Sequence, residues 1–182
     1  MANTYEAIAK SVLTSDTAAV TFSSIPSTFT DLLVVFSIRG DATYETNNGD
    51  ALAMRINGSS TAQYSVRALR GQGTTVDSIA RTTGNADSFI RTYGGVASNS
   101  YTANTFSLGK VYIPNYTVAQ SKAIYTNVVA ENNSATANVI AANAQLWQNT
   151  SAITSLEFTY TFNASSKFVS GSSFYLYGIK NT

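Results

Sequence analysis

Residues 156–162 read LEFTYTF, and this stretch decides the fold class. Apolar side chains stand at every second position, at 156, 158, 160 and 162, and Glu or Thr lies between them. Successive side chains of a β-strand point to opposite faces of the sheet. The stretch therefore predicts an antiparallel strand with one face in the core and one face toward solvent.

Similar strand signals recur along the chain. AAVTFSSI (18–25) alternates in the same way, and residues 105–114 and 122–132 are rich in β-branched and aromatic side chains. DLLVVFSIR (31–39) is a continuous apolar run, which is typical of a central strand buried on both faces. The alanine-rich stretch 134–148 is open to a helix or a strand, and its Asn and Thr content favours a strand.

Turn signals separate these stretches. ETNNGD (45–50) and INGSS (56–60) contain Asn-Gly, which is the strongest short signal for a hairpin, and YIPNY (112–116) predicts a Pro-Asn turn. Roughly ten short strands with almost no helix predict an all-β, antiparallel two-sheet β-sandwich with long loops, of jelly-roll type. We expect a single domain over residues 1–182, with a long loop region at about 71–103 that is functional or holds short extra strands.

The amino-acid composition excludes several classes of functional site. The chain has 182 residues, 44% of them hydrophobic and only 12% charged, with a net charge of +1 and neither Cys nor His. Triads that depend on His and zinc sites that depend on Cys are thereby excluded. The scattered basic residues provide no footprint for nucleic acid, and no apolar stretch is long enough for a membrane helix. We expect no cofactor, and a soluble product made in the cytoplasm.

A weak candidate for a calcium site lies in GDATYETNNGD (40–50). Asp41, Glu45 and Asp50, with Asn47 and Asn48 between them, provide the hard oxygen ligands that Ca²⁺ prefers. Their spacing is not that of an EF-hand, and a solvated loop between strands is the favoured interpretation.

Other candidate residues are open to two interpretations each. Glu131 and Glu157 are the only acids that a glycosidase could pair in the last hundred or so residues, but Glu157 alternates with apolar residues on a strand and is expected to face outward. Trp147 suits a sugar-binding platform, although a core or interface anchor is favoured. Arg67 and Arg70 suit ion pairs at a protein interface.

The chain closes with SGSSFYLYGIKNT (170–182), which is unusually apolar for a terminus. As a strand, this segment places apolar residues on both faces, so we expect a paired strand with one face in the core and the other covered by a loop or a neighbouring subunit. Gly178 would permit a bulge or a close backbone approach. The predicted structural residues of this segment are Phe174, Tyr175, Leu176, Tyr177 and Ile179.

The two ends of the chain, together with a short middle segment, resemble a known family. TYEAIAKSVL followed by VTFSSIPSTFTDL near the start, VYIPNY in the middle, and GSSFYLYGI at the end are similar to structural proteins of tailed bacteriophages, common in phages of cyanobacteria and other aquatic bacteria. The similarity covers nearly the whole chain, and residues 41–103 carry the least of it. Its end motif is distinctive but defines no active site.

The resemblance implies a virion component without enzymatic activity. It implies a capsid decoration or cement protein that binds the major capsid protein and itself, often as a homotrimer, on the capsid surface. A tail- or fibre-associated module that binds a carbohydrate or a receptor is the alternative. Decoration is favoured because the chain contains no coiled-coil or collagen-like shaft.

Overall fold

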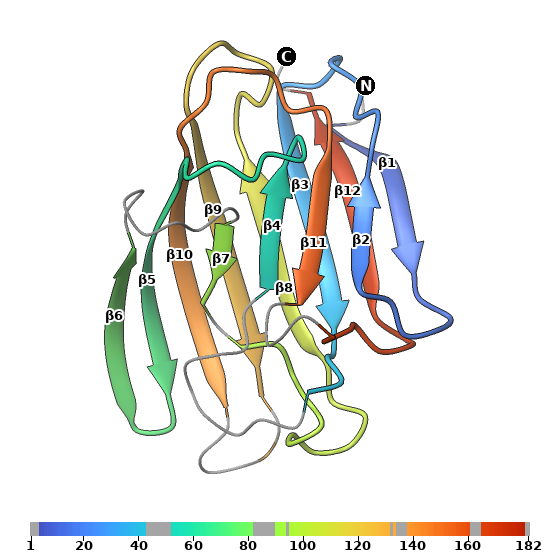
Figure 1. Cartoon of the computed structure of the whole chain (residues 1–182), viewed down its shortest axis with the longest axis vertical. Helices are drawn as coiled ribbons and strands as arrows, with labels where there is room; N and C mark the ends of the chain where they lie inside the picture. The colour runs from blue at the N-terminus through green and yellow to red at the C-terminus, as the bar shows by residue number, and fades with distance from the viewer. Residues whose placement is uncertain are drawn as a thin grey trace.

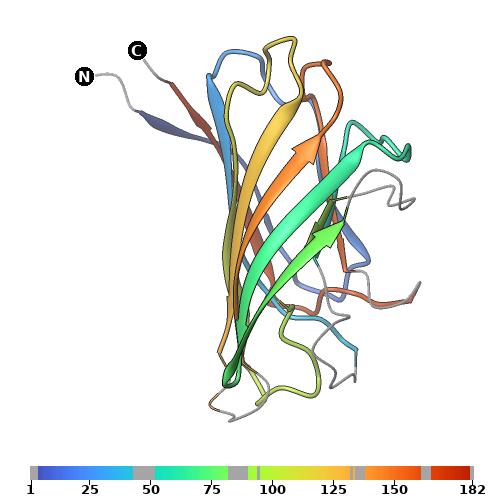
Figure 2. The same ribbon diagram turned by 90° about the vertical axis from the view of Figure 1, so that its left-hand side faces the viewer.

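A computed structural model describes residues 4–42, 52–81, 90–93, 95–131, 133, 138–160 and 165–180. Twelve β-strands and no helix occur among these residues. The strands form two antiparallel sheets that pack face to face, which confirms the predicted all-β sandwich (Figures 1 and 2).

The two sheets differ in size. The large sheet has eight strands, in the spatial order β1 (Tyr5–Val12), β12 (Ser173–Ile179), β3 (Asp31–Ile38), β8 (Ser107–Ile113), β9 (Lys122–Ala130), β10 (Val139–Trp147), β5 (Tyr64–Gln72) and β6 (Thr75–Arg81). The small sheet has four, in the order β2 (Ala19–Phe22), β11 (Leu156–Tyr160), β4 (Leu52–Ile56) and β7 (Ile90–Thr92). The jelly-roll type is not confirmed, because jelly rolls divide eight strands between two sheets.

Most predicted strands are present. The stretch at 156–162 contains β11, whose inward side chains are buried and whose outward side chains are half-buried, although residues 161 and 162 lie outside the described residues. The ambiguous stretch 134–148 contains the strand β10. The expected loop region at 71–103 contains the end of β5, all of β6 and the short strand β7, so much of it belongs to the two sheets.

The Asn-Gly turn at 56–60 does not form the predicted hairpin. Asn57 and Gly58 do adopt positive φ angles of 52° and 66°. The flanking strands β4 and β5 nevertheless belong to different sheets, so the turn carries the chain from the small sheet to the large one. The side chain of Asn57 accepts hydrogen bonds from the backbone amides of Thr154 and Ser155 at 2.8 and 3.1 Å, which fixes this crossing. The other Asn-Gly, at 48–49, lies outside the described residues.

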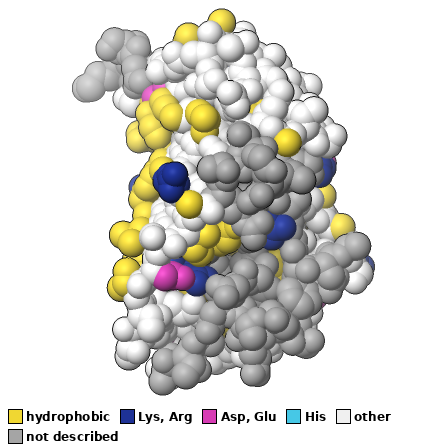
Figure 3. Space-filling model, turned by 60° about the vertical axis from the view of Figure 1, so that its left-hand side comes forward, with side chains coloured by type: hydrophobic (Ala, Val, Ile, Leu, Met, Phe, Trp, Pro, Cys, Tyr) yellow, Lys and Arg dark blue, Asp and Glu magenta, His cyan; other side chains and the backbone are white. Residues whose placement is uncertain are grey.

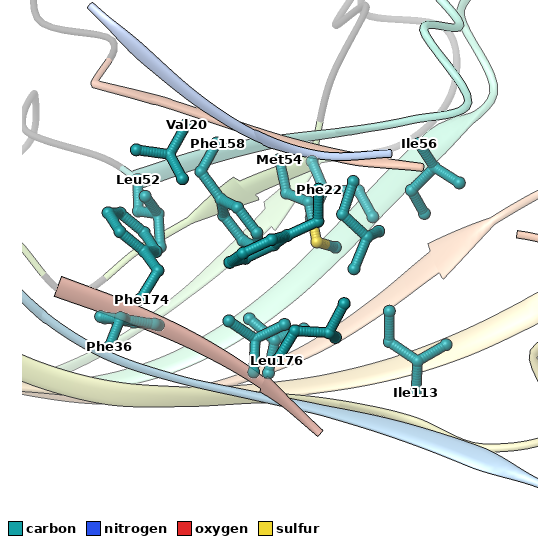
Figure 4. Packing of buried hydrophobic residues seen from close by; sticks show 14 of the residues in the cluster. Val20, Phe22, Phe36, Leu52, Met54, Ile56, Ile113, Phe158, Phe174 and Leu176 are labelled. Atoms are coloured by element: carbon teal, nitrogen blue, oxygen red, sulfur yellow. The ribbon is translucent and has the colours of Figure 1, made fainter. Parts of the chain in front are cut away.

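One large hydrophobic core lies between the sheets (Figure 4). Phe22 and Phe158 of the small sheet point toward Phe36, Phe174 and the aliphatic side chains of the large sheet. The rings of Phe158 and Phe174 are 5.4 Å apart between centroids, and those of Phe22 and Phe158 are 6.4 Å apart. Aromatic pairs at these separations contribute roughly 0.5–1.5 kcal/mol beyond the burial of their area.

The strand β3 is central, as predicted, but it is not fully buried on both faces. Leu32, Val34, Phe36 and Ile38 point inward and are at most 1% exposed, whereas the outward residues between them are half-buried. The prediction of burial on both faces was wrong because no described segment forms a layer over the other side of the large sheet (Figure 2).

The terminal strand β12 lies between β1 and β3, so both of its edges are paired. Gly178 permits the predicted close approach, because a Cβ at this position would lie 2.3 Å from the ring of Phe29. The bulge falls instead in the neighbouring strand β1, between Ala7 and Ala9. The unusual chain end therefore forms an interior strand of the large sheet and carries Phe174 and Leu176 into the core.

Candidate functional site

The large sheet has an inner face against the small sheet and an outer face that no described segment covers. On the outer face, one line of residues crosses five neighbouring strands: Leu108 lies opposite Val129, then come Ile140, Gly71 and Val76 in register. We call these five residues the apolar row. Exposed apolar residues in an unbroken row are unusual on a protein that works alone, and they indicate an interaction surface.

Tyrosines form a second line on the same face. Tyr177 lies opposite Leu33, which lies opposite Tyr112, which lies opposite Tyr125. We call these four residues the tyrosine row. Tyr125 is 44% exposed, and the other three are half-buried. Tyrosine supplies apolar contact area and a hydroxyl together, which suits a surface that binds a partner.

A buried carboxylate fixes the middle of the tyrosine row. Asp31 begins β3 and is 3% exposed. Its carboxylate accepts hydrogen bonds from the hydroxyl of Tyr112 at 2.7 Å and from the backbone amide of Asn115 at 2.9 Å. The hydrogen bond from Tyr112 to this anion, together with burial, raises the pKa of Tyr112 to about 12. Tyr112 is therefore held in its neutral, hydrogen-bonded form.

Two hollows lie on the outer face. One, of about 580 Å³, is lined by Gly71, Val76, Val129 and Ile140, with Glu131 and Asn138 among the polar groups near its end. The other, of about 360 Å³, lies over Ala123 and Ala144 between larger neighbours. Because small residues lie beside large ones, the outer face has depressions that side chains of a partner could fill.

Two buried cations hold loops rather than a ligand. The guanidinium of Arg39, at the end of β3, donates to the carbonyls of Thr102 and Thr105 at 3.0 and 2.8 Å and to that of Tyr101 at 3.3 Å. No described carboxylate pairs with Arg39, and burial lowers its pKa. Its acceptors are all groups of one loop, so its role is to order that loop.

Lys122 has the same kind of role at the start of β9. It is fully buried, its ammonium donates to the carbonyls of Val118 and Gln120, and burial lowers its pKa. The ammonium also lies 6.0 Å from the centre of the Trp147 ring. Trp147 is 1% exposed and belongs to the core, so it cannot serve as a surface platform for a sugar in this conformation.

A polar bridge joins the two sheets, and the sequence patterns did not indicate it. Asn143 and Gln145 of β10 point to the inner face, where alternation predicts apolar residues. Asn143 accepts from the amide of Tyr93 at 2.9 Å and donates to its carbonyl at 3.0 Å, and Gln145 donates to the carbonyl of Arg91 at 3.0 Å. The two side chains thus hydrogen-bond to the backbone at β7 as a neighbouring strand would. Their only sequence signal is the Asn and Gln content of a strand.

The two predicted interface arginines have different environments. Arg67 is exposed on the outer face. Arg70 is 6% exposed on the inner face of β5, where it binds the carboxylate of Asp77 on β6 with contacts of 3.0 and 2.6 Å. The hydrogen bond from Arg70 lowers the pKa of Asp77. Arg70 therefore joins the edge strand β6 to the sheet, and only Arg67 is available to a partner.

The terminal aromatic residues divide between the faces. Phe174 and Leu176 lie in the core and are fully buried, and Ile179 is buried near the end of β12. Tyr175 and Tyr177 are half-buried on the outer face. Among the described residues no loop covers these tyrosines, so the predicted cover by a loop is not found in this part of the chain.

The acidic candidates do not gather. Glu157 pairs with Arg55 across the small sheet at 2.6 Å, whereas Glu131 follows β9 in the large sheet. Asp41 accepts a hydrogen bond from the amide of Lys167, and Glu45 and Asp50 lie outside the described residues. Within the described ranges, no group of three or more acidic residues is placed to hold a metal ion.

No protein-family model and no curated protein matches the chain. Among the described residues, none forms a helix that could span a membrane.

Proposed function

We propose that this chain is a structural, non-enzymatic virion protein of a tailed bacteriophage, which decorates the outside of the capsid shell and stabilises it through contacts between subunits. The observation that carries the proposal is the outer face of the large sheet, with its exposed apolar row and its partly exposed tyrosine row. The sequence resemblance supplies the phage context. A homotrimer on the capsid surface is part of this proposal.

The physical character of the chain suits this role. A virion protein persists outside the cell in changing salt, and burial of aromatic side chains is screened by salt far less than surface ion pairs are. With 12% charged residues and no Cys, the chain depends little on ion pairs and has no thiol to oxidise. Binding that favours the assembled shell would stabilise it by mass action.

Quantitative mass spectrometry of purified virions, separated into heads and tails, tests the proposal. We expect the chain in the head fraction, at a copy number of the same order as that of the major capsid protein. Absence from heads, or only a few copies per particle, would contradict a decoration role.

The tyrosine row favours one alternative, a tail- or fibre-associated module that binds a host carbohydrate. Tyrosine rings pack on sugar faces, and their hydroxyls can bind sugar hydroxyls. The buried Trp147 no longer supports this alternative. A glycan array distinguishes the two functions: binding that is lost in Tyr125→Ala would favour the tail module, and no binding by the purified protein would count against it.

A further inference from the structure

We infer that the outer face of the large sheet is the docking surface, and that its occupant is a different protein whose contact surface is apolar in the middle and carries carboxylates. This inference rests on the proposed function and adds which side of the sandwich faces the shell and what chemistry it meets there.

The exposed apolar area is concentrated on this face. Leu108, Ile140 and Val76 of the apolar row are 58%, 61% and 75% exposed, and Leu69 beside them on β5 is 59% exposed. Figure 3 shows hydrophobic side chains gathered at the surface along one margin of the molecule in a view toward the β6 side. Eight strands about 4.8 Å apart, with outward residues about 7 Å apart along each strand, provide an area near the roughly 800 Å² that each partner contributes to a standard interface.

The exposed charges on this face are mostly positive. Its strands carry three exposed cations, Lys10 on β1, Lys110 on β8 and Arg67 on β5, and none of them forms an ion pair with a described residue. The one outward carboxylate on these strands, Asp31, is buried and bound by Tyr112. Glu131, just past the end of β9, is exposed and lines the hollow beside Ile140, so it is the one exposed negative charge near the three cations among the described residues. A partner that supplies carboxylates would satisfy all three cations.

The spacing of the cations distinguishes between partners. Successive cations are three strands apart in the sheet order, which corresponds to roughly 14 Å. A second copy docked by the same face would bring three cations toward three cations and, among the described residues, would supply only one exposed carboxylate, that of Glu131. A nucleic acid needs a denser basic track and gains little from Leu, Val and Ile side chains. An apolar protein surface with separate carboxylates matches both the rows and the charges.

Because the chain has no Cys, single-Cys variants can report which face is covered. Ala142 is exposed in the middle of the outer face, beside Leu69 and Asn127 in register. Thr21 is exposed on the outer side of the small sheet and serves as the matched control. Ala142→Cys and Thr21→Cys would be placed in the phage genome, and maleimide labelling would be measured for each protein free and in purified virions.

We expect Ala142→Cys to label at least about tenfold more slowly in virions than in the free protein, and Thr21→Cys to label equally in both. Equal labelling of Ala142→Cys in virions would overturn the inference and leave the virion role intact. Absence of the wild-type protein from virions would overturn the proposed function and this inference together. Slow labelling of Ala142→Cys in the free oligomer would identify a second copy as the occupant and would overturn the inference. Loss of the protection of Ala142→Cys when DNA is emptied from the particles would point to DNA as the occupant and would also overturn it.

A charge reversal tests the carboxylates of the partner. We expect Lys110→Glu to lower the number of copies retained on virions by at least about tenfold after a wash at an ionic strength of about 0.01 M, where the Debye length is about 30 Å and surface charges are least screened. Lys167→Glu, which makes the same change in the connection between β11 and β12, should retain the wild-type number. Equal retention of both variants, each with a cooperative melt, would contradict an acidic partner surface.

Discussion

Asn143 is a polar residue at a position where the alternation of β10 predicts a core side chain. It satisfies both backbone groups of Tyr93, and it also donates to the carbonyl of Thr126 at 3.2 Å. Buried polar groups that lose a partner cost about 1–3 kcal/mol each. We therefore expect Asn143→Leu to lower the free energy of unfolding by about 2–4 kcal/mol in chemical denaturation.

The matched control is Asn127→Leu, which makes the same change on the neighbouring strand β9. Asn127 points to the outer face, and its side-chain oxygen has no hydrogen-bond partner. A cost within about 0.5 kcal/mol is expected there. Equal effects of the two substitutions would contradict the role of Asn143 in holding β7.

Tyr112 gives the fold a dependence on alkaline pH. Its pKa of about 12 is above the ordinary value of 10.0, so the folded state holds the phenolic proton more tightly than the unfolded state does. The stabilisation is complete below pH 10 and is lost as the pH rises toward 12. We expect the wild type to lose stability over this window more steeply than Tyr112→Phe, measured by denaturation at each pH. Parallel curves for the two proteins would show that Tyr112 titrates normally.

Sequence periodicity predicts side-chain direction well and partner choice poorly. Phe158 and Phe174 follow their alternation into the core, because burial of large apolar groups decides which face points inward. The roles of Asn143 and Arg39 depend on groups about fifty or more residues away, which no local pattern contains. The burial of Trp147 agrees with the favoured prediction, which rests on the general preference of a lone Trp in an all-β domain for the core.

At the scale of elements, β12 explains why the chain ends in apolar residues. This strand joins β1 to β3 over its whole length, and it delivers Phe174 and Leu176 to the core. Removing β12 would separate β1 from the sheet and open the core. We expect a chain that lacks residues 174–182 to show no cooperative melt in calorimetry or circular dichroism.

A shorter deletion is the control for this prediction. Among the described interactions, removing residues 180–182 takes away the backbone hydrogen bond from Lys180 to Thr4 at 3.1 Å, the contact of the Lys180 ammonium with the Phe29 ring at 5.2 Å, and the surface ion pair between Lys180 and Glu6 at 3.2 Å. Such pairs contribute about 0–1 kcal/mol. The shorter deletion should therefore melt cooperatively, and a cooperative melt of the longer one would contradict the role of β12.

The sequence predicts which segments form strands better than it predicts which strands pair with one another. The strands at 18–25, 105–114, 122–132 and 156–162 were identified because alternation and β-branched residues are local signals. The Asn-Gly turn at 57–58 has the backbone of a hairpin turn but connects two sheets, because the choice of sheet depends on what each strand buries. The strands β6 and β7 lie in the region 71–103, whose length is compatible with short extra strands but whose polar composition does not locate them.

At the scale of the whole molecule, the sandwich is unequal. Four strands cover part of one face of an eight-strand sheet, and the other face keeps its exposed apolar row (Figures 1 and 2). The sequence predicts two sheets but not how the strands are divided between them. That division depends on pairing between strands from opposite ends of the chain, such as β1 and β12, which no local pattern contains. The inequality matters for function, since it leaves a broad, weakly charged surface for a partner.

The most direct test of the account is a cryo-EM map of the virion at a resolution that separates β-strands. We expect a two-sheet sandwich on the outside of the capsid, repeated with the symmetry of the shell, with its eight-stranded sheet toward the capsid and its four-stranded sheet away from it. A map in which the protein is absent from the head, or contacts it through the four-stranded sheet, would contradict the account.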